Sequence, residues 1–102
     1  MLTVTEISQK LFPIFAKNDI KKAIIFGSYA KNEATLYSDI DLLVDTQEHV
    51  RGLKLFGILG EIKDALDLDV DLIVQRMVTP DSVIDMEIKN TGVVIYEQHA
   101  KC

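Results

Sequence analysis

The sequence predicts an α/β (α+β) fold in which helices flank a small mixed sheet. Two hydrophobic periods alternate along the chain: apolar residues three and four apart, as on one helix face, and short apolar runs typical of strands. The resulting helix–strand unit occurs four times, an order typical of helices packed on a sheet. The 102 residues are 48% hydrophobic and 26% charged, so we expect one globular domain over residues 1–102.

The first segment is predicted to be an amphipathic helix. Residues 4–18 place apolar side chains at helical spacing, and Thr3 or Thr5 offers an oxygen that can cap the first turn. Pro13 lies inside the pattern. Because proline lacks the amide hydrogen, we expect it to kink or split the helix.

A short strand and a polar turn follow. The apolar run at 23–26 ends at Gly27, which indicates a buried strand. Ser28 is a possible cap for a short helix over 28–33. Asn32 tolerates the left-handed backbone in which such a helix ends.

The remaining chain continues the alternation. An Asp-apolar alternation predicts two strands, and a proline at the first helical position predicts where the last helix begins. The predicted elements are a strand over 39–44, a helix over 49–66, a strand over 68–74, a helix from Thr79-Pro80-Asp81 to about Lys89, and a strand over 93–96.

Composition disfavours several classes of function. Lys and Arg number 11 and Asp and Glu 16, which gives a net charge of −5. Binding to a nucleic-acid backbone depends on clustered Lys and Arg, so we expect no direct nucleic-acid partner. The one cysteine excludes an intramolecular disulfide. No apolar run has the length of a membrane span and no signal peptide is visible, so we expect a cytoplasmic protein without a membrane partner.

Aspartates on two strands are the candidate catalytic and metal-binding residues. Asp39 and Asp41 leave the same face of their strand, about 7 Å apart along the backbone. Asp67, Asp69 and Asp71 also share one face, and if their strand lies beside the second, one of them completes a triad. Carboxylate oxygens are the ligands that Mg²⁺ prefers. Two Mg²⁺ ions in such a triad would clamp the attacking and leaving oxygens in phosphoryl or nucleotidyl transfer.

The glycine–serine pair Gly27-Ser28 is the candidate nucleotide-binding turn. A glycine lets the backbone approach a phosphate, and amides at a helix start hold anionic oxygens together with a serine hydroxyl. Taken singly, Ser28 is more simply a helix cap and Asp39 a turn residue. The joint pattern of Gly-Ser, ten residues and Asp-x-Asp arises by chance in about one in a thousand chains of this length, which favours a functional site.

The stretch IIFGSYAKNEATLYSDIDLLVD resembles the signature of the DNA polymerase beta-like nucleotidyltransferase superfamily. The short length and the ending TGVVIYE resemble the minimal nucleotidyltransferases (MNT), small prokaryotic proteins that are usually paired with a helical HEPN-domain partner. The resemblance implies that Asp39, Asp41 and Asp71 bind two Mg²⁺ ions. It implies that Asp71 also helps to deprotonate the attacking hydroxyl, and that Gly27 and Ser28 hold the triphosphate of ATP.

The same resemblance implies an antitoxin that transfers AMP from ATP to a tyrosine of a HEPN ribonuclease toxin within a hetero-oligomer. Two positions depart from the family pattern: Tyr29 stands where an arginine is common, and Asn32 where a glycine is common. Lys31 can supply a charge in place of the arginine, but only as a point charge. These departures favour an alternative, a non-catalytic module that neutralises the toxin by binding. The complete acidic set favours the enzyme.

Overall fold

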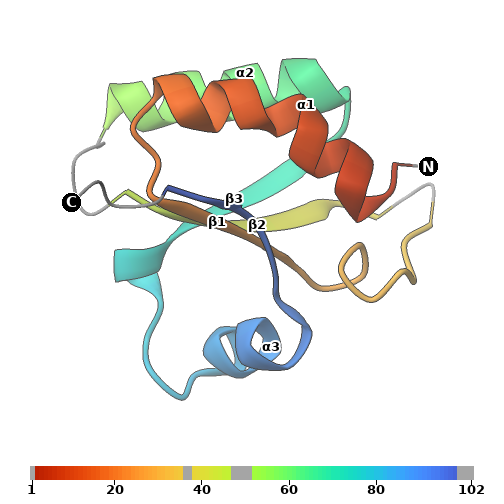
Figure 1. The fold of residues 1–102 in the computed structure, drawn as a ribbon. Helices are drawn as coiled ribbons and strands as arrows, with labels where there is room; N and C mark the ends of the chain where they lie inside the picture. Colours follow the sequence, from red (N-terminus) through yellow and green to blue (C-terminus); the bar gives the residue numbers. More distant parts are fainter. Residues whose placement is uncertain (1, 36–37, 47–51, 99–102) are drawn as a thin grey trace.

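The computed structural model describes residues 2–35, 38–46 and 52–98, and it contains one four-stranded sheet with helices on both faces (Figure 1). This arrangement confirms the predicted fold class. The elements, in chain order, are α1 (Val4–Lys17), β1 (Lys22–Phe26), β2 (Ile40–Asp45), α2 (Leu53–Leu66), β3 (Val70–Val74), the 3₁₀ turn η1 (Gln75–Met77), α3 (Val83–Thr91) and β4 (Val93–Glu97).

The sheet is mixed, with the strand order β3-β2-β1-β4. Strand β1 lies in the interior and pairs antiparallel with both β2 and β4. Strand β2 pairs parallel with β3, in the register that sets Asp41 beside Asp71. The adjacency of the second and third strands, on which the acidic triad depends, is therefore confirmed.

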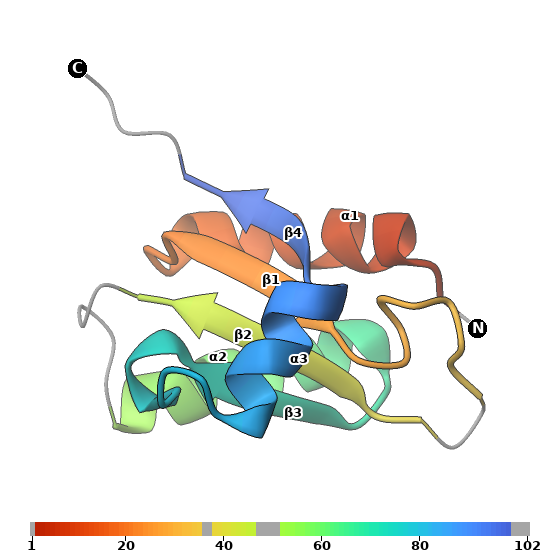
Figure 2. The same ribbon diagram turned by 90° about the horizontal axis from the view of Figure 1, so that it is seen from below.

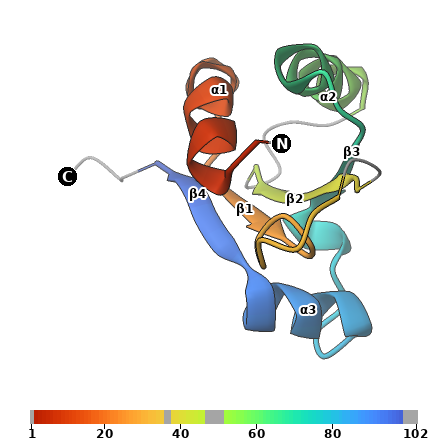
Figure 3. The ribbon, with the colours of Figure 1, turned by 90° about the vertical axis from the view of Figure 1, so that its right-hand side faces the viewer.

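The hydrophobic core lies between the sheet and the helices α1 and α2, which cover one face, while α3 crosses the other face (Figures 1 and 3). Alternation along β2 sends Ile40, Leu42 and Val44 into this core, where each is fully buried. Asp41 and Leu43 therefore lie on the opposite face. Helix α3 crosses this face (Figure 2). None of the described helices has the length and hydropathy of a membrane-spanning helix.

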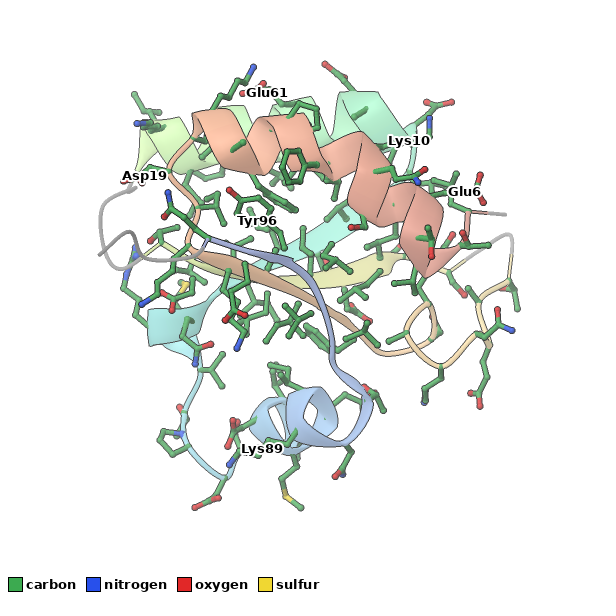
Figure 4. The ribbon with its side chains drawn as sticks, in the orientation of Figure 1. Glu6, Lys10, Asp19, Glu61, Lys89 and Tyr96 are labelled. Atoms are coloured by element: carbon green, nitrogen blue, oxygen red, sulfur yellow. The ribbon has the colours of Figure 1, made fainter. Side chains whose placement is uncertain are left out.

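Helix α1 starts as predicted and continues through its proline. The Thr3 hydroxyl accepts the amide of Glu6 at 3.1 Å, and the Glu6 carboxylate accepts the amide of Thr3 at 3.0 Å. Pro13 lies inside the helix without splitting it. Tyr96 on β4 packs on α1, with its ring centre 5.4 Å from that of Phe15 (Figure 4). Because helices in proteins are stabilised mainly by tertiary packing, α1 can tolerate the hydrogen bond that proline removes.

The start of the last helix differs from the prediction. Asp81 has a φ of 62°, a left-handed conformation with which no helix can begin, so Pro80 lies before the helix and not in its first turn. The helix begins after Ser82, whose hydroxyl accepts the amide of Asp85 at 3.2 Å. A side-chain cap thus decided the boundary. The predicted start of α2 at residue 49 falls outside the described residues.

Candidate active site

Asp41 occupies the centre of the candidate site. Asp41 pairs with Phe26 on β1 and with Asp71 on β3, so both neighbours share its face of the sheet. Neighbouring strands lie about 4.8 Å apart, so the backbone register places Asp41 and Asp71 side by side on this face. Because Gly27 follows Phe26, the end of β1 reaches the same point. The predicted glycine–serine turn and the acidic residues therefore meet at one end of the sheet.

The third acidic residue, Asp39, lies immediately before β2 and is exposed. It is one of the groups whose charge acts on Asp41. All three side chains offer hard oxygen donors of the kind Mg²⁺ takes. In the described ranges, however, no three acidic, His or Cys side chains converge tightly enough to hold one ion. The backbone brings Asp41 and Asp71 together and places Asp39 nearby, while their side chains are not drawn together.

Negative charge accumulates around Asp41. Partial burial raises the pKa of its carboxyl, and the charges of Asp71, Asp39 and Glu87 raise this pKa further. Every charged group in this set is acidic. Like charges at such spacing repel, so the site favours a bound cation.

Glu87 is a member of the acidic cluster that the sequence did not reveal. It belongs to α3, which packs against β1 on the face that carries Asp41. Its side chain is partly buried. The helix is separated from the Asp-x-Asp pattern by more than forty residues of sequence. Only the packing of α3 on the sheet shows that the two belong to one site.

Gly27 leaves room for Asp41. A Cβ at position 27 would overlap with Oδ2 of Asp41 and would lie 3.4 Å from its Cγ. Gly27 also has a φ of 74°, a conformation that residues with side chains rarely adopt. Glycine is thus favoured at this point both by the left-handed backbone and by the position of the neighbouring carboxylate.

The segment after Gly27 is a compact turn and not the predicted helix over 28–33. The amide of Lys31 donates to the Gly27 carbonyl at 3.1 Å, and the amide of Glu33 donates to the Ser28 carbonyl at 2.8 Å. The two hydrogen bonds join residues at different separations in the sequence, whereas a regular α-helix repeats one separation. Six residues are too few to extend a regular helix beyond its nucleus. Asn32 has a φ of 58°, which confirms the predicted left-handed residue.

The start of this turn presents free donors. Within the described residues, the amides of Ser28, Tyr29 and Ala30 donate no hydrogen bond, and the Ser28 hydroxyl has no partner. Successive free amides at the start of a turn are suited to anionic oxygens. The turn can therefore receive phosphate oxygens next to the acidic cluster.

The departure at Tyr29 and the charge that Lys31 could supply in its place lie in different surroundings. Tyr29 is 5% exposed and belongs to the hydrophobic core. It therefore packs in the core and does not replace the charge of the family's arginine. Lys31 is exposed, with its Nζ 3.8 Å from Glu33.

Two aspartates of the predicted Asp-apolar alternation lie outside the third strand. Asp67 ends α2 in a left-handed conformation, and Asp69 precedes β3. Asp71 alone of the three stands in register with Asp41.

Comparison with known proteins identifies the class. The family signature described as "Polymerase beta, Nucleotidyltransferase" matches residues 9–101, so the chain belongs to the polymerase beta nucleotidyltransferase family. A candidate protein adenylyltransferase of Methanocaldococcus jannaschii is 38% identical over 78% of this chain and 85% of its own length. The protein adenylyltransferase MntA of Thermococcus cleftensis is 33% identical over 74% of this chain and 80% of its own length.

Solved structures share the fold. A toxin–antitoxin crystal structure with AMP-PNP superposes with a TM-score of 0.75 at 22% identity, over 89% of this chain and 73% of the other. A tri-AMPylated Shewanella oneidensis HEPN toxin in complex with an MNT antitoxin gives a TM-score of 0.70 at 20% identity, over 94% of this chain and 74% of the other. The chain is a nucleotidyltransferase with the polymerase beta-like fold, and the resemblance to the minimal nucleotidyltransferases is confirmed.

Proposed function

We propose that the chain is an antitoxin that transfers AMP from ATP to a tyrosine hydroxyl of a HEPN ribonuclease toxin. The observation that carries this proposal is the register of the sheet, which places Asp41 between Asp71 and the end of β1 at Gly27. Phosphate-binding amides and carboxylates thus share one end of the sheet. The names of the adenylyltransferase relatives and the AMPylated HEPN complex support the choice of acceptor.

The phosphates are assigned to the turn after β1. The free amides of Ser28, Tyr29 and Ala30 and the Ser28 hydroxyl would bind the anionic oxygens of the β- and γ-phosphates. Gly27 contributes by its missing side chain, which keeps this turn in contact with the acidic cluster. The α-phosphate is thereby directed toward Asp41.

Asp39, Asp41 and Asp71 would hold two Mg²⁺ ions. Bound there, these ions would neutralise the phosphates and stabilise the attacking and leaving oxygens. Asp71 lies at the β3 side of the cluster and is exposed, so it can accept the proton of an incoming hydroxyl. In the reaction, the tyrosine oxygen forms a bond to the α-phosphorus, the bond to the β-phosphate oxygen breaks, and pyrophosphate leaves.

The acceptor is assigned to a partner protein. The relatives that are named protein adenylyltransferases and the AMPylated HEPN toxin support an acceptor hydroxyl on another protein. The net charge of −5 also fits a protein acceptor better than a nucleic acid.

The proposal is tested by incubating the chain with a HEPN-domain protein encoded beside it, Mg²⁺, and ATP labelled at either the α- or the γ-phosphate. Transfer of AMP labels the HEPN protein from α-labelled ATP only. Label from γ-labelled ATP would indicate phosphoryl transfer and would contradict the proposal. A tight complex that silences the toxin without label would establish the alternative, a binding antitoxin.

A further inference from the structure

A contact between α3 and the turn after β1 joins two parts of the chain that are 64 residues apart. The amide of Gly27 donates to the hydroxyl oxygen of Thr91 at 3.2 Å. The same hydroxyl donates its proton to the carbonyl of Glu87 at 2.8 Å. With its one proton committed inside the helix, the Thr91 oxygen can only accept from Gly27. The direction of both hydrogen bonds is therefore fixed.

Gly92, the residue after Thr91, also packs closely against β1. A Cβ on Gly92 would lie 2.9 Å from Cγ2 of Ile24 and would overlap with the Ile88 carbonyl oxygen. Close backbone packing thus holds the end of α3 on β1, next to the hydrogen bond from Gly27. Thr91 is itself half-buried, which shields this hydrogen bond from water.

The contact divides the donors of the turn into two groups. The Gly27 amide is already occupied by Thr91, whereas the amides of Ser28, Tyr29 and Ala30 are free in the described structure. A nucleotide phosphate would therefore meet the turn from Ser28 onward. Gly27 would act through its shape and its fixed position, without donating to the phosphate.

We propose that Thr91 is a positioning residue for the nucleotide: by binding the Gly27 amide, it orients the turn so that the following amides face the triphosphate of ATP beside Asp41. This inference rests on the proposed function, since it needs a nucleotide at the turn. It makes α3 part of the nucleotide site, through its last residue.

The test compares three full-length variants with the wild type. Thr91→Val removes the hydroxyl with little change in shape, Thr91→Ser keeps it, and Ser82→Ala weakens the same helix at its opposite end. Two quantities are measured: the hydrogen-exchange rate of the Gly27 amide by NMR, and the Kd for AMP-PNP with Mg²⁺. Thr91→Ala replaces the valine variant if valine prevents folding.

We expect Thr91→Val to speed exchange at Gly27 and to weaken AMP-PNP binding by about 5- to 10-fold, the effect of losing one hydrogen bond that orients the donors. Thr91→Ser should restore both quantities. Ser82→Ala should lower the melting temperature and leave the Kd unchanged.

Two results would overturn the inference and leave the proposed function standing. If Thr91→Val binds AMP-PNP like the wild type, Thr91 does not position the turn. If Ser82→Ala weakens binding as much as Thr91→Val does, the effect is general helix stability. A wild type that fails to bind AMP-PNP would instead refute the proposed function, and the inference with it. The two failures are therefore distinguishable.

Discussion

Gly27 and Asp41 lie so close together that a side chain at position 27 would displace the Asp41 carboxylate. The Cγ of Asp41 would be 3.4 Å from a Cβ there, and its Oδ2 would overlap with it. Gly27 directly follows β1, whose last residue Phe26 pairs with Asp41 on the antiparallel strand β2. The turn assigned to the phosphates and the centre of the acidic cluster are thus in direct contact.

This contact makes Gly27→Ala a strongly destabilising change. The left-handed backbone alone costs about 1–2 kcal/mol with a Cβ present, and the overlap with Asp41 adds to it. We expect the free energy of unfolding, measured with urea, to fall by about 2 kcal/mol or more. The surviving folded protein should also lose activity, because Asp41 must move.

Gly57→Ala is the matched control. Gly57 lies in the exposed part of α2, and a Cβ there meets no atom within 4 Å. Alanine favours the helix over glycine, so the same urea measurement should show a gain of about 0.5–1 kcal/mol. A loss of stability at both glycines would show that the Gly27–Asp41 contact is not the cause.

Asp41→Asn should stabilise the metal-free protein at pH 7. The pKa of Asp41 is raised in the folded state, by burial and by three acidic neighbours, so ionising it costs folding free energy. At pH values between the ordinary pKa of 3.8 and the raised pKa, Asp41 holds a proton more readily in the folded chain than in the unfolded chain. Wild-type stability therefore falls as pH rises through this window.

The stability difference between Asp41→Asn and the wild type should consequently shrink as pH is lowered through the same window. Below it, both side chains are neutral. Urea unfolding with a chelator present, repeated across pH, measures this difference. A variant less stable than the wild type at pH 7 would contradict the electrostatic account of the site.

Asp71 and Asp69 should differ sharply in their effect on catalysis. Both are exposed aspartates of the third-strand segment, but only Asp71 is in register with Asp41. We expect Asp71→Asn to lower kcat by at least about 100-fold, as for loss of a general base or metal ligand. Asp69→Asn should remain close to the wild type. Equal losses would place the third carboxylate elsewhere.

Replacing Thr46 with valine is expected to stabilise the folded protein. Its side chain is 1% exposed, and in the described structure its hydroxyl has no hydrogen-bond partner. Thr46→Val keeps the shape and removes the unpaired polar atom. The melting temperature should rise, with a gain of about 1 kcal/mol in the free energy of unfolding. An unchanged or lower value would indicate that the hydroxyl is satisfied in solution.

The sequence predicted most of the fold because its two hydrophobic periods are local signals. Strand alternation located β2 and β3, and the Gly-Ser and Asp-x-Asp spacing located the residues that the sheet brings together at Asp41. The prediction of a short helix after Gly27 was wrong because a capping serine and a few residues do not overcome the cost of helix nucleation. The start of α3 was wrong because Asp81 adopts a left-handed backbone.

Two site residues could not be located from local patterns. Glu87 and Thr91 stand one turn apart on α3, and they reach the site only because α3 packs over β1. Their spacing of four residues puts them on one helix face, which is the sole sequence signal they carry. Which face of which helix meets the aspartates is decided by tertiary packing.

The measurement that tests the central claim most directly is labelling of the HEPN partner from α-labelled ATP and Mg²⁺, with the wild type beside Asp41→Asn. The variant is expected to be at least as stable as the wild type, so unfolding cannot explain a loss. We predict labelled partner with the wild type and none with the variant. Equal labelling by Asp41→Asn, or no labelling by a wild type that binds its partner, would contradict the claim.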